Sequence, residues 1–140
     1  MYDLMQHAAT PYSPLIGLAP LMRHAFLRHD LAPLGEALLA RAQARYLAER
    51  VQATPELELL APVTLNIVCF RHRGVASGDG DAFNGEIVAD LHESGIAAPS
   101  TTTIGGKLAI RAAIVNHRTR AEDIDALLAG VLRFGAARLS

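Results

Sequence analysis

Two adjacent glycines, Gly105 and Gly106, separate two stretches that are both rich in strand-forming residues. The stretch before them, residues 97–104, ends in threonines and an isoleucine, and the stretch after them, residues 107–116, places apolar residues at alternate positions. Such a short link joins neighbouring antiparallel strands, because parallel strands need a long crossover connection. The sequence therefore predicts a β-hairpin, and with it a sheet that is mostly antiparallel.

Further elements surround this hairpin. Apolar residues spaced three and four apart predict helices over residues 34–52, 81–94 and 120–135. Residues 63–71 are rich in β-branched and apolar residues on both faces, which predicts a central strand. Helices interleaved with a small antiparallel sheet predict an α+β fold, in which the helices cover one face of the sheet.

The ends of these helices carry recognisable signals. The first helix should stop before Pro55, since proline cannot continue a helix. Asp81 is the expected N-cap of the second helix, and Gly95 is expected to end it. Thr119 and Glu122 have the spacing of a capping box at the start of the third.

Residues 1–32 differ from the rest of the chain. They contain prolines at positions 11, 14 and 20, and proline at such spacing interrupts helices and is excluded from central strands. We expect an irregular arm with one short helix here, followed by an α+β domain over residues 33–140.

The composition narrows the class of protein. The chain has 140 residues, 51% of them hydrophobic, which is enough for one domain with its own core. A net charge of -1 offers no basic surface for nucleic acid or an anionic membrane, so neither is an expected partner. Cys69 has no second cysteine with which to form an internal disulfide, so we expect a reducing compartment, the cytoplasm.

Arg111 is the most informative residue of the C-terminal half, because it interrupts an otherwise apolar strand. A buried guanidinium without a partner is costly, so it needs a carboxylate, carbonyl groups or water. One interpretation pairs Arg111 with an acid of its own domain or leaves it on an exposed sheet face. The other offers its guanidinium to a ligand carboxylate, for which the planar fork is suited.

Other candidate chemistries fail on spacing. No two histidines have the i, i+4 spacing of zinc helices, and no base is identifiable beside Cys69. Lys107 follows two glycines at the start of a strand, where a lysine is usually solvated rather than held in a pocket that lowers its pKa. We therefore predict no catalytic, cofactor-binding or metal-ligating residue in this chain.

Several motifs occur in a specific order over about residues 28–134. They are the helix that contains Leu34-Gly35-Glu36, the run from Leu65 to Arg71, Pro99-Ser100-Thr101-Thr102, the strand from Leu108 to Asn116, and the segment from Thr119 to Ile124. Together they resemble the C-terminal small domain of the group II pyridoxal-phosphate-dependent amino-acid decarboxylases, which include the aromatic-amino-acid, glutamate and diaminobutyrate decarboxylases.

This resemblance implies a fold-type-I homodimer with pyridoxal 5'-phosphate (PLP) bound near the dimer interface. In that family the lysine that carries the cofactor lies upstream, in a large domain that no segment of this chain resembles, so the chain alone is expected to bind no PLP. In glutamate decarboxylases the arginine of an Arg-x-x-Ile-x-Asn pattern points toward the substrate carboxylate. Arg111, Ile114 and Asn116 match this pattern, so Arg111 is the expected substrate-binding residue.

Two functions are compatible with these observations. The chain is either the C-terminal portion of a PLP-dependent decarboxylase, inactive alone and partnered by a large PLP-binding domain, or a non-catalytic α+β module that dimerises or regulates. A small enzyme complete in itself is not supported, because no acid–base pair, nucleophile motif or metal cluster is present.

Overall fold

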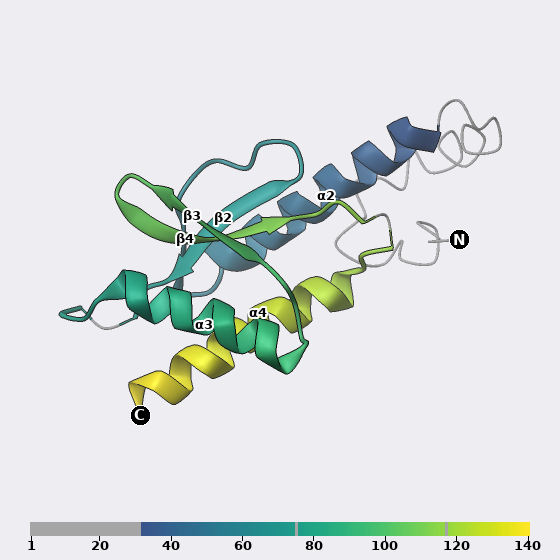
Figure 1. Cartoon of the computed structure of the whole chain (residues 1–140). Helices are drawn as coiled ribbons and strands as arrows, with labels where there is room; N and C mark the ends of the chain where they lie inside the picture. The colour runs from purple at the N-terminus through teal and green to yellow at the C-terminus, as the bar shows by residue number, and fades with distance from the viewer. Residues whose placement is uncertain (1–31, 75, 117) are drawn as a thin grey trace.

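The computed structural model describes residues 32–74, 76–116 and 118–140 (Figure 1). The expected arm lies outside these residues, apart from Ala32, which begins the first described helix. The described elements are α2 (Ala32–Gln52), β1 (Leu57–Leu59), β2 (Ile67–His72), α3 (Gly80–Ser94), β3 (Ser100–Ile104), β4 (Lys107–Ala113) and α4 (Ala121–Leu139). None of these helices is long and apolar enough to cross a membrane.

The four described strands form one antiparallel sheet in the order β1-β2-β4-β3. β2 lies inside the sheet between β1 and β4, and β3 and β4 form the hairpin that Gly105 and Gly106 connect. Both glycines have positive φ angles, 57° and 79°, which glycine adopts without the steric cost of a Cβ atom. The predicted α+β class is confirmed.

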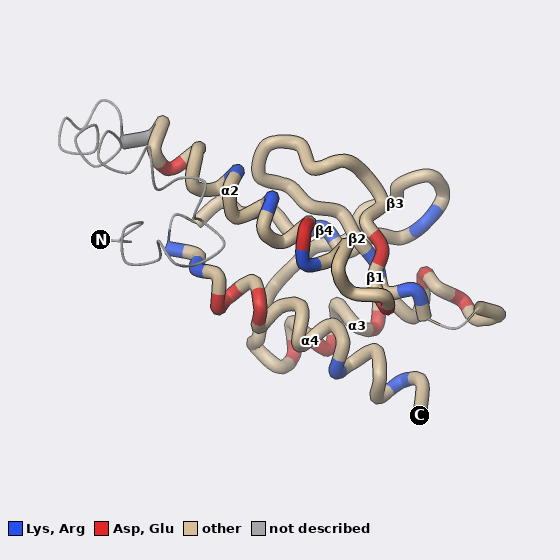
Figure 2. The backbone as a smooth tube through the Cα atoms, turned by 180° about the vertical axis from the view of Figure 1, so that it is seen from behind, with Lys and Arg blue, Asp and Glu red and all other residues tan. Residues whose placement is uncertain are grey.

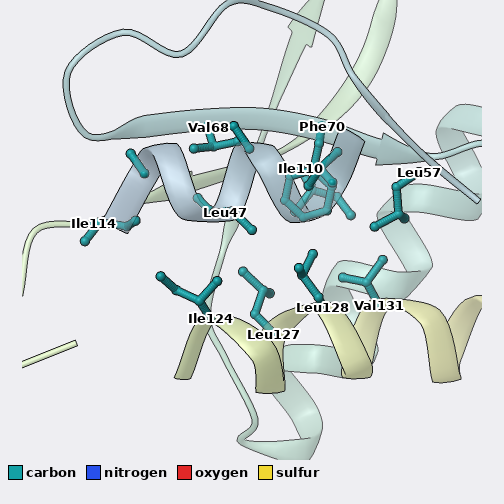
Figure 3. Close-up of a cluster of buried hydrophobic side chains, with 14 of the residues drawn as sticks. Leu47, Leu57, Val68, Phe70, Ile110, Ile114, Ile124, Leu127, Leu128 and Val131 are labelled. Atoms are coloured by element: carbon teal, nitrogen blue, oxygen red, sulfur yellow. The ribbon is translucent and has the colours of Figure 1, made fainter. Parts of the chain in front are cut away.

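The hydrophobic core lies between one face of this sheet and the three helices. Val68 and Phe70 of β2 and Ile110 of β4 point to the helices, where Leu47 of α2 and Leu128 of α4 meet them (Figure 3). Because strand residues alternate between faces, the same strands present Cys69 and Arg111 to the opposite face. Within the described residues, the sheet therefore has one face covered by helices and one face without them.

β2 begins later than predicted, at Ile67 rather than residue 63. Residues 64–67 form a tight turn, in which the amide of Ile67 donates to the carbonyl of Thr64 (3.2 Å). Leu65 occupies a left-handed conformation in this turn (φ 57°), and its side chain is exposed. β propensity alone does not reveal this turn, because Leu65 is not a residue type that normally favours positive φ.

The other strands are shorter than predicted, and one was missed. β3 begins at Ser100 rather than residue 97, and β4 ends at Ala113 rather than residue 116. β1 has only three residues, in which the buried Leu57 and half-buried Leu59 flank Glu58. Three residues are too few to give an alternation signal, so only the pairing with β2 defines this strand.

The two predicted N-caps are displaced, by two residues at the start of α3 and by one residue at the start of α4. Asp79, not Asp81, caps α3, because its Oδ1 accepts from the amides of Asp81 and Ala82 at 3.1 Å. The carboxylate of Asp81 instead accepts from the amide of Leu108 in β4 (2.9 Å). α4 begins one residue later in the sequence than the predicted capping box requires.

The capping box of α4 is formed by Arg120 and Asp123 rather than by Thr119 and Glu122. The amide of Arg120 donates to Oδ2 of Asp123 (2.8 Å). The end of α3 falls where it was expected, at Gly95, which has φ 74°. Two carboxylates compete at each helix start, Asp79 with Asp81 and Glu122 with Asp123, and local spacing does not decide between them.

Candidate functional site

A hollow of about 520 Å³ lies at the end of β4. Its walls are the loop of residues 96–99, the last residues of β4 and the first turns of α4, with Leu47 of α2 also contributing. The lining is mainly apolar, and its polar side chains come from Ser100, Arg111, Thr119 and Asp123. An apolar hollow with a few polar groups is the usual form of a small-ligand site.

Arg111 reaches this hollow from β4. It lies opposite Cys69 on one neighbouring strand and opposite Ser100 on the other. Its Nη1 lies 3.5 Å from Oγ of Ser100, a weak contact. Among the residues that the structure describes, no carboxylate forms an ion pair with Arg111. The structure thus places this half-exposed guanidinium on the sheet face without helices, free of an internal acid.

The remaining residues of the Arg-x-x-Ile-x-Asn pattern have structural positions. Ile114 is buried in the core, and its amide donates to the carbonyl of Asn66 (2.9 Å). Oδ1 of Asn116 accepts from the amide of Arg118 (2.9 Å), and its carbonyl accepts from the amide of Thr119 (3.0 Å). These two residues therefore end the strand and turn the chain into α4. Ile114 also lines the hollow, and Arg111 is the charged member of the pattern that does so.

Cys69 lies beside Arg111, half-buried on the same face. Burial raises the pKa of its thiol, and the charge of Arg111 opposes that rise only in part. A thiol with a raised pKa is a poor nucleophile near neutral pH. Cys69 thus lies on the sheet face opposite the core.

Lys107 lies at the other end of β4, away from the hollow. Its ammonium is 4.0 Å from Oε1 of Glu58, and its side chain is 57% exposed. Nothing in this position removes water from the amine, so it matches the expectation of a solvated lysine. In residues 32–74, 76–116 and 118–140, no three or more His, Cys, Asp or Glu side chains gather in a group that could hold a metal ion.

Gln43 is a buried residue near the hollow that sequence reasoning missed. Its Nε2 donates to the carbonyl of Thr119, which lines the hollow, while its Oε1 is buried without a hydrogen-bond partner. A polar side chain within the apolar stripe of a helix is the signal that could have found it. Asp123, already engaged at the start of α4, was also missed as a lining residue.

No family model and no curated protein matches this sequence. Solved structures do match its fold. The glutamate decarboxylase domain of diaminobutyrate-pyruvate transaminase and L-2,4-diaminobutyrate decarboxylase from Vibrio parahaemolyticus matches with a TM-score of 0.69 and 24% identity, over 78% of this chain and 24% of that chain. Oryza sativa TDC with PLP matches with a TM-score of 0.71 and 21% identity, over 79% of this chain and 25% of that chain. Catharanthus roseus tryptophan decarboxylase in complex with L-tryptophan matches with a TM-score of 0.67 and 20% identity, over 73% of this chain and 22% of that chain.

The chain has the fold of the C-terminal region of PLP decarboxylases. The resemblance inferred from the sequence motifs is thereby confirmed at the level of the fold. The chain spans about a quarter of the length of the solved chains that it matches. Its fold accordingly corresponds to one part of those longer chains.

Proposed function

We propose that this chain is the C-terminal portion of a PLP-dependent amino-acid decarboxylase, a carboxy-lyase, in which it shapes the substrate side of the active site. The observation that carries the proposal is the fold match to decarboxylases over 73% to 79% of this chain in the three comparisons above. The unpaired guanidinium of Arg111 at the hollow supports it. The complete enzyme is then a cytoplasmic homodimer, or this chain joined by a separate large domain.

Arg111 is the proposed substrate-binding residue. A guanidinium donates two parallel hydrogen bonds to a carboxylate, and this pair is stronger when water is partly excluded. The side chain of Arg111 extends from β4, which is paired with β2 on one side and β3 on the other, and this pairing fixes the position of its Cα atom. Such an arrangement orients an amino-acid substrate by its carboxylate. In L-2,4-diaminobutyrate this carboxylate is the group that leaves as carbon dioxide, so the ion pair positions the substrate and is lost as the carbon–carbon bond breaks.

The residues of this chain do not fit PLP itself. The cofactor is held as a Schiff base by a lysine in a pocket, and Lys107 is the one lysine of the sequence. Its side chain is 57% exposed and lies beside Glu58 at the end of β4 away from Arg111. The cofactor of the complete enzyme therefore belongs to the remainder of the architecture, and we expect the isolated chain to be inactive.

A chimera tests the role of Arg111. Residues 32–140 replace the matching segment of the Vibrio decarboxylase domain, and carbon dioxide release from L-2,4-diaminobutyrate is measured. Arg111→Ala should lower kcat/KM by about tenfold or more, the size expected for a lost charge-assisted pair. Arg118→Ala is the matched control and should leave kcat/KM unchanged. A folded, PLP-loaded chimera that is equally active with Arg111→Ala would contradict the assignment.

The cofactor assignment has its own test on the isolated chain. The chain is mixed with PLP, reduced with borohydride and mapped by mass spectrometry. We expect no stoichiometric adduct on Lys107, because its exposed amine lies in no pocket that would hold the cofactor in place. A stoichiometric adduct on Lys107 would make this chain a cofactor-binding protein in its own right.

A non-catalytic, dimerising module is the second candidate function. It is favoured by the exposed apolar side chains of Leu65 and Val115, which are 61% and 81% accessible at one end of the sheet. Large exposed apolar groups that cluster often mark association surfaces. A stable dimer of the isolated chain, together with an inactive chimera, would favour this function over the first.

A further inference from the structure

The two edges of the sheet differ in how far the described residues cover them. At one edge, β1 has three residues, one of them the charged Glu58, and the amide of Leu57 already donates to the carbonyl of Thr54 (3.0 Å). At the other edge, β3 has five residues, and none of their side chains is buried. The outer edge of β3 is therefore the longer and the more open of the two.

The backbone alternation of β4 shows which of its residues bond to β3. The amide of Ile114, directly after β4, donates to the carbonyl of Asn66, on the β2 side of the strand. Successive residues of a strand direct their N–H and C=O groups to opposite sides. The odd-numbered residues of β4, which include Ala109 and Arg111, therefore bond to β3.

The same alternation identifies the outward-facing groups of β3. Thr102 lies opposite Ala109, so its backbone groups bond inward, to β4. Thr101 and Thr103 then direct their N–H and C=O groups outward. No other described residue forms a hydrogen bond with these outward groups. The outer edge of β3 thus offers unpaired donors and acceptors to a further strand.

β3 lacks the features that usually protect a sheet edge. Natural edge strands are commonly blunted by charged residues, proline or a bulge. The sequence of β3 is Ser-Thr-Thr-Thr-Ile, and its register with β4 is continuous. The nearest charged residue of the hairpin is Lys107, beyond the turn at the start of β4 (Figure 2). Threonine also favours extended backbone, so β3 is suited to accept another strand.

Both ends of β3 limit where such a strand can pair. Pro99 precedes it and has no N–H group to donate, and its carbonyl accepts from Nε2 of His92 in α3 (2.6 Å). Gly105 follows it in the hairpin turn, with φ 57°. Pairing is therefore confined to Ser100–Ile104, and the midpoint of this strand is Thr102.

This midpoint makes β3 complementary to a second copy of itself. Two β3 strands can meet antiparallel with Thr102 opposite the partner's Thr102. Thr101 then lies opposite the partner's Thr103, and every outward N–H and C=O group of both strands finds a partner. Threonines meet threonines, which form favourable cross-strand pairs, and no like charges come into opposition.

We propose that the outer edge of β3 is a self-association surface, at which two copies of this chain pair their β3 strands about a two-fold axis at Thr102. The two four-stranded sheets then form one continuous sheet. A two-fold interface uses the same patch of both copies, as a self-complementary strand requires. A single strand pair buries little surface, so the association depends strongly on concentration. The inference does not rest on the proposed decarboxylase function.

Sedimentation equilibrium of the full chain over a range of concentrations tests the proposal. Thr101→Pro removes an outward donor from each copy and none from the ladder with β4. It should raise the dissociation constant of the dimer by about tenfold or more. Thr101→Val keeps the donor and the shape of the side chain and should change this constant by less than about twofold. The exchange rate of the Ile110 amide, inside the sheet, reports whether each variant stays folded.

Thr102 offers a second test, because in the dimer it meets its own copy. Thr102→Lys and Thr102→Glu each place like charges directly opposite one another, which destabilises the pair. Each variant alone should associate about tenfold more weakly than the parent chain. An equal mixture of the two places lysine opposite glutamate and should restore association. Such restoration requires the two positions to be in contact, which a general loss of structure does not produce.

Three results would overturn the proposal. The first is a parent chain that stays monomeric at concentrations up to about 1 mM. The second is a dimer that Thr101→Pro and both Thr102 variants leave unchanged, which would place the interface elsewhere. The third is slow amide exchange at Thr101 and Thr103 in the dilute monomer, which would mean that the chain already covers its own edge.

Discussion

At the scale of single residues, the junction between β2 and α3 depends on buried polar groups that satisfy one another. The side chain of Asn84 is fully buried, accepts from the amide of His72 (2.8 Å) and donates to its carbonyl (2.9 Å). The ring of His72 accepts at Nδ1 from the amide of Gly74 (2.9 Å) and packs against Phe83. Each bond replaces one that water would make in the unfolded chain, so the loss of any partner leaves a costly unpaired group.

The buried ring of His72 predicts a pH dependence of stability. Burial lowers the pKa of His72 below its ordinary value of 6.5, and the nearby Glu56 raises it only in part. The unfolded chain therefore binds this proton more tightly, and the stabilisation present above pH 6.5 is lost as the pH falls through the lowered pKa. The urea midpoint should decrease between about pH 7.5 and about pH 5.5.

The variant His72→Asn separates this contribution from that of other titrating groups, because its side-chain oxygen can still accept from Gly74. Its urea midpoint should depend less on pH than that of the parent chain. Identical pH dependence in both proteins would show that His72 is not the group responsible.

At the scale of elements, the sheet and α4 approach each other closely where a side chain is missing. A Cβ atom at Gly135 of α4 would lie 2.6 Å from the ring of His72 in β2, closer than real Cβ contacts. A glycine in a helix is unfavourable by itself, so its presence here reflects packing rather than helix propensity. Sequence periodicity predicted a helix here over residues 120–135, whereas α4 continues to Leu139, and periodicity could not show which of its residues must remain small.

Gly135→Ala and Gly85→Ala form a matched pair of helix substitutions. Gly135→Ala should lower the free energy of unfolding by about 1–3 kcal/mol, because the histidine ring is buried and held by Gly74 and Phe83. A Cβ atom at Gly85 of α3 meets only Leu108 at 3.8 Å, so Gly85→Ala should be neutral or stabilise by about 0.5–1 kcal/mol. Urea denaturation measures both. Equal effects of the two substitutions would remove the close approach as an explanation.

At the scale of the whole molecule, polar contacts join helices that lie far apart in the sequence. The hydroxyl of Tyr46 in α2 donates to Oδ1 of Asp125 in α4 (2.6 Å). Burial, followed by this hydrogen bond, raises the pKa of Tyr46 to about 12. On the other side of α4, Arg138 contacts Glu86 and Asp90 of α3 at 2.5 Å and 2.7 Å. These contacts join α4 to α2 and to α3.

Tyr46→Phe should loosen α2 from α4. It removes one hydrogen bond to a carboxylate and should lower the free energy of unfolding by about 1 kcal/mol, with the core otherwise intact. Thr54→Val, which removes an exposed hydroxyl bonded within its own turn, is a control of similar chemistry and should change stability less. Thermal unfolding followed by circular dichroism compares them, and an unchanged midpoint for Tyr46→Phe would contradict a stabilising role for this contact.

The sequence by itself determined the α+β class, the β3–β4 hairpin and the apolar stripes of the helices. These features depend on neighbours in the chain: Gly105 and Gly106 permit a tight turn, and residues three and four apart share a helix face. Tertiary structure alone decided that Asp79 rather than Asp81 caps α3, since Asp81 is drawn to Leu108 across the fold. It also decided that Arg111 faces the hollow without an internal acid and that Pro99 is fastened to His92. Such outcomes depend on which distant groups meet, and local spacing does not contain that information.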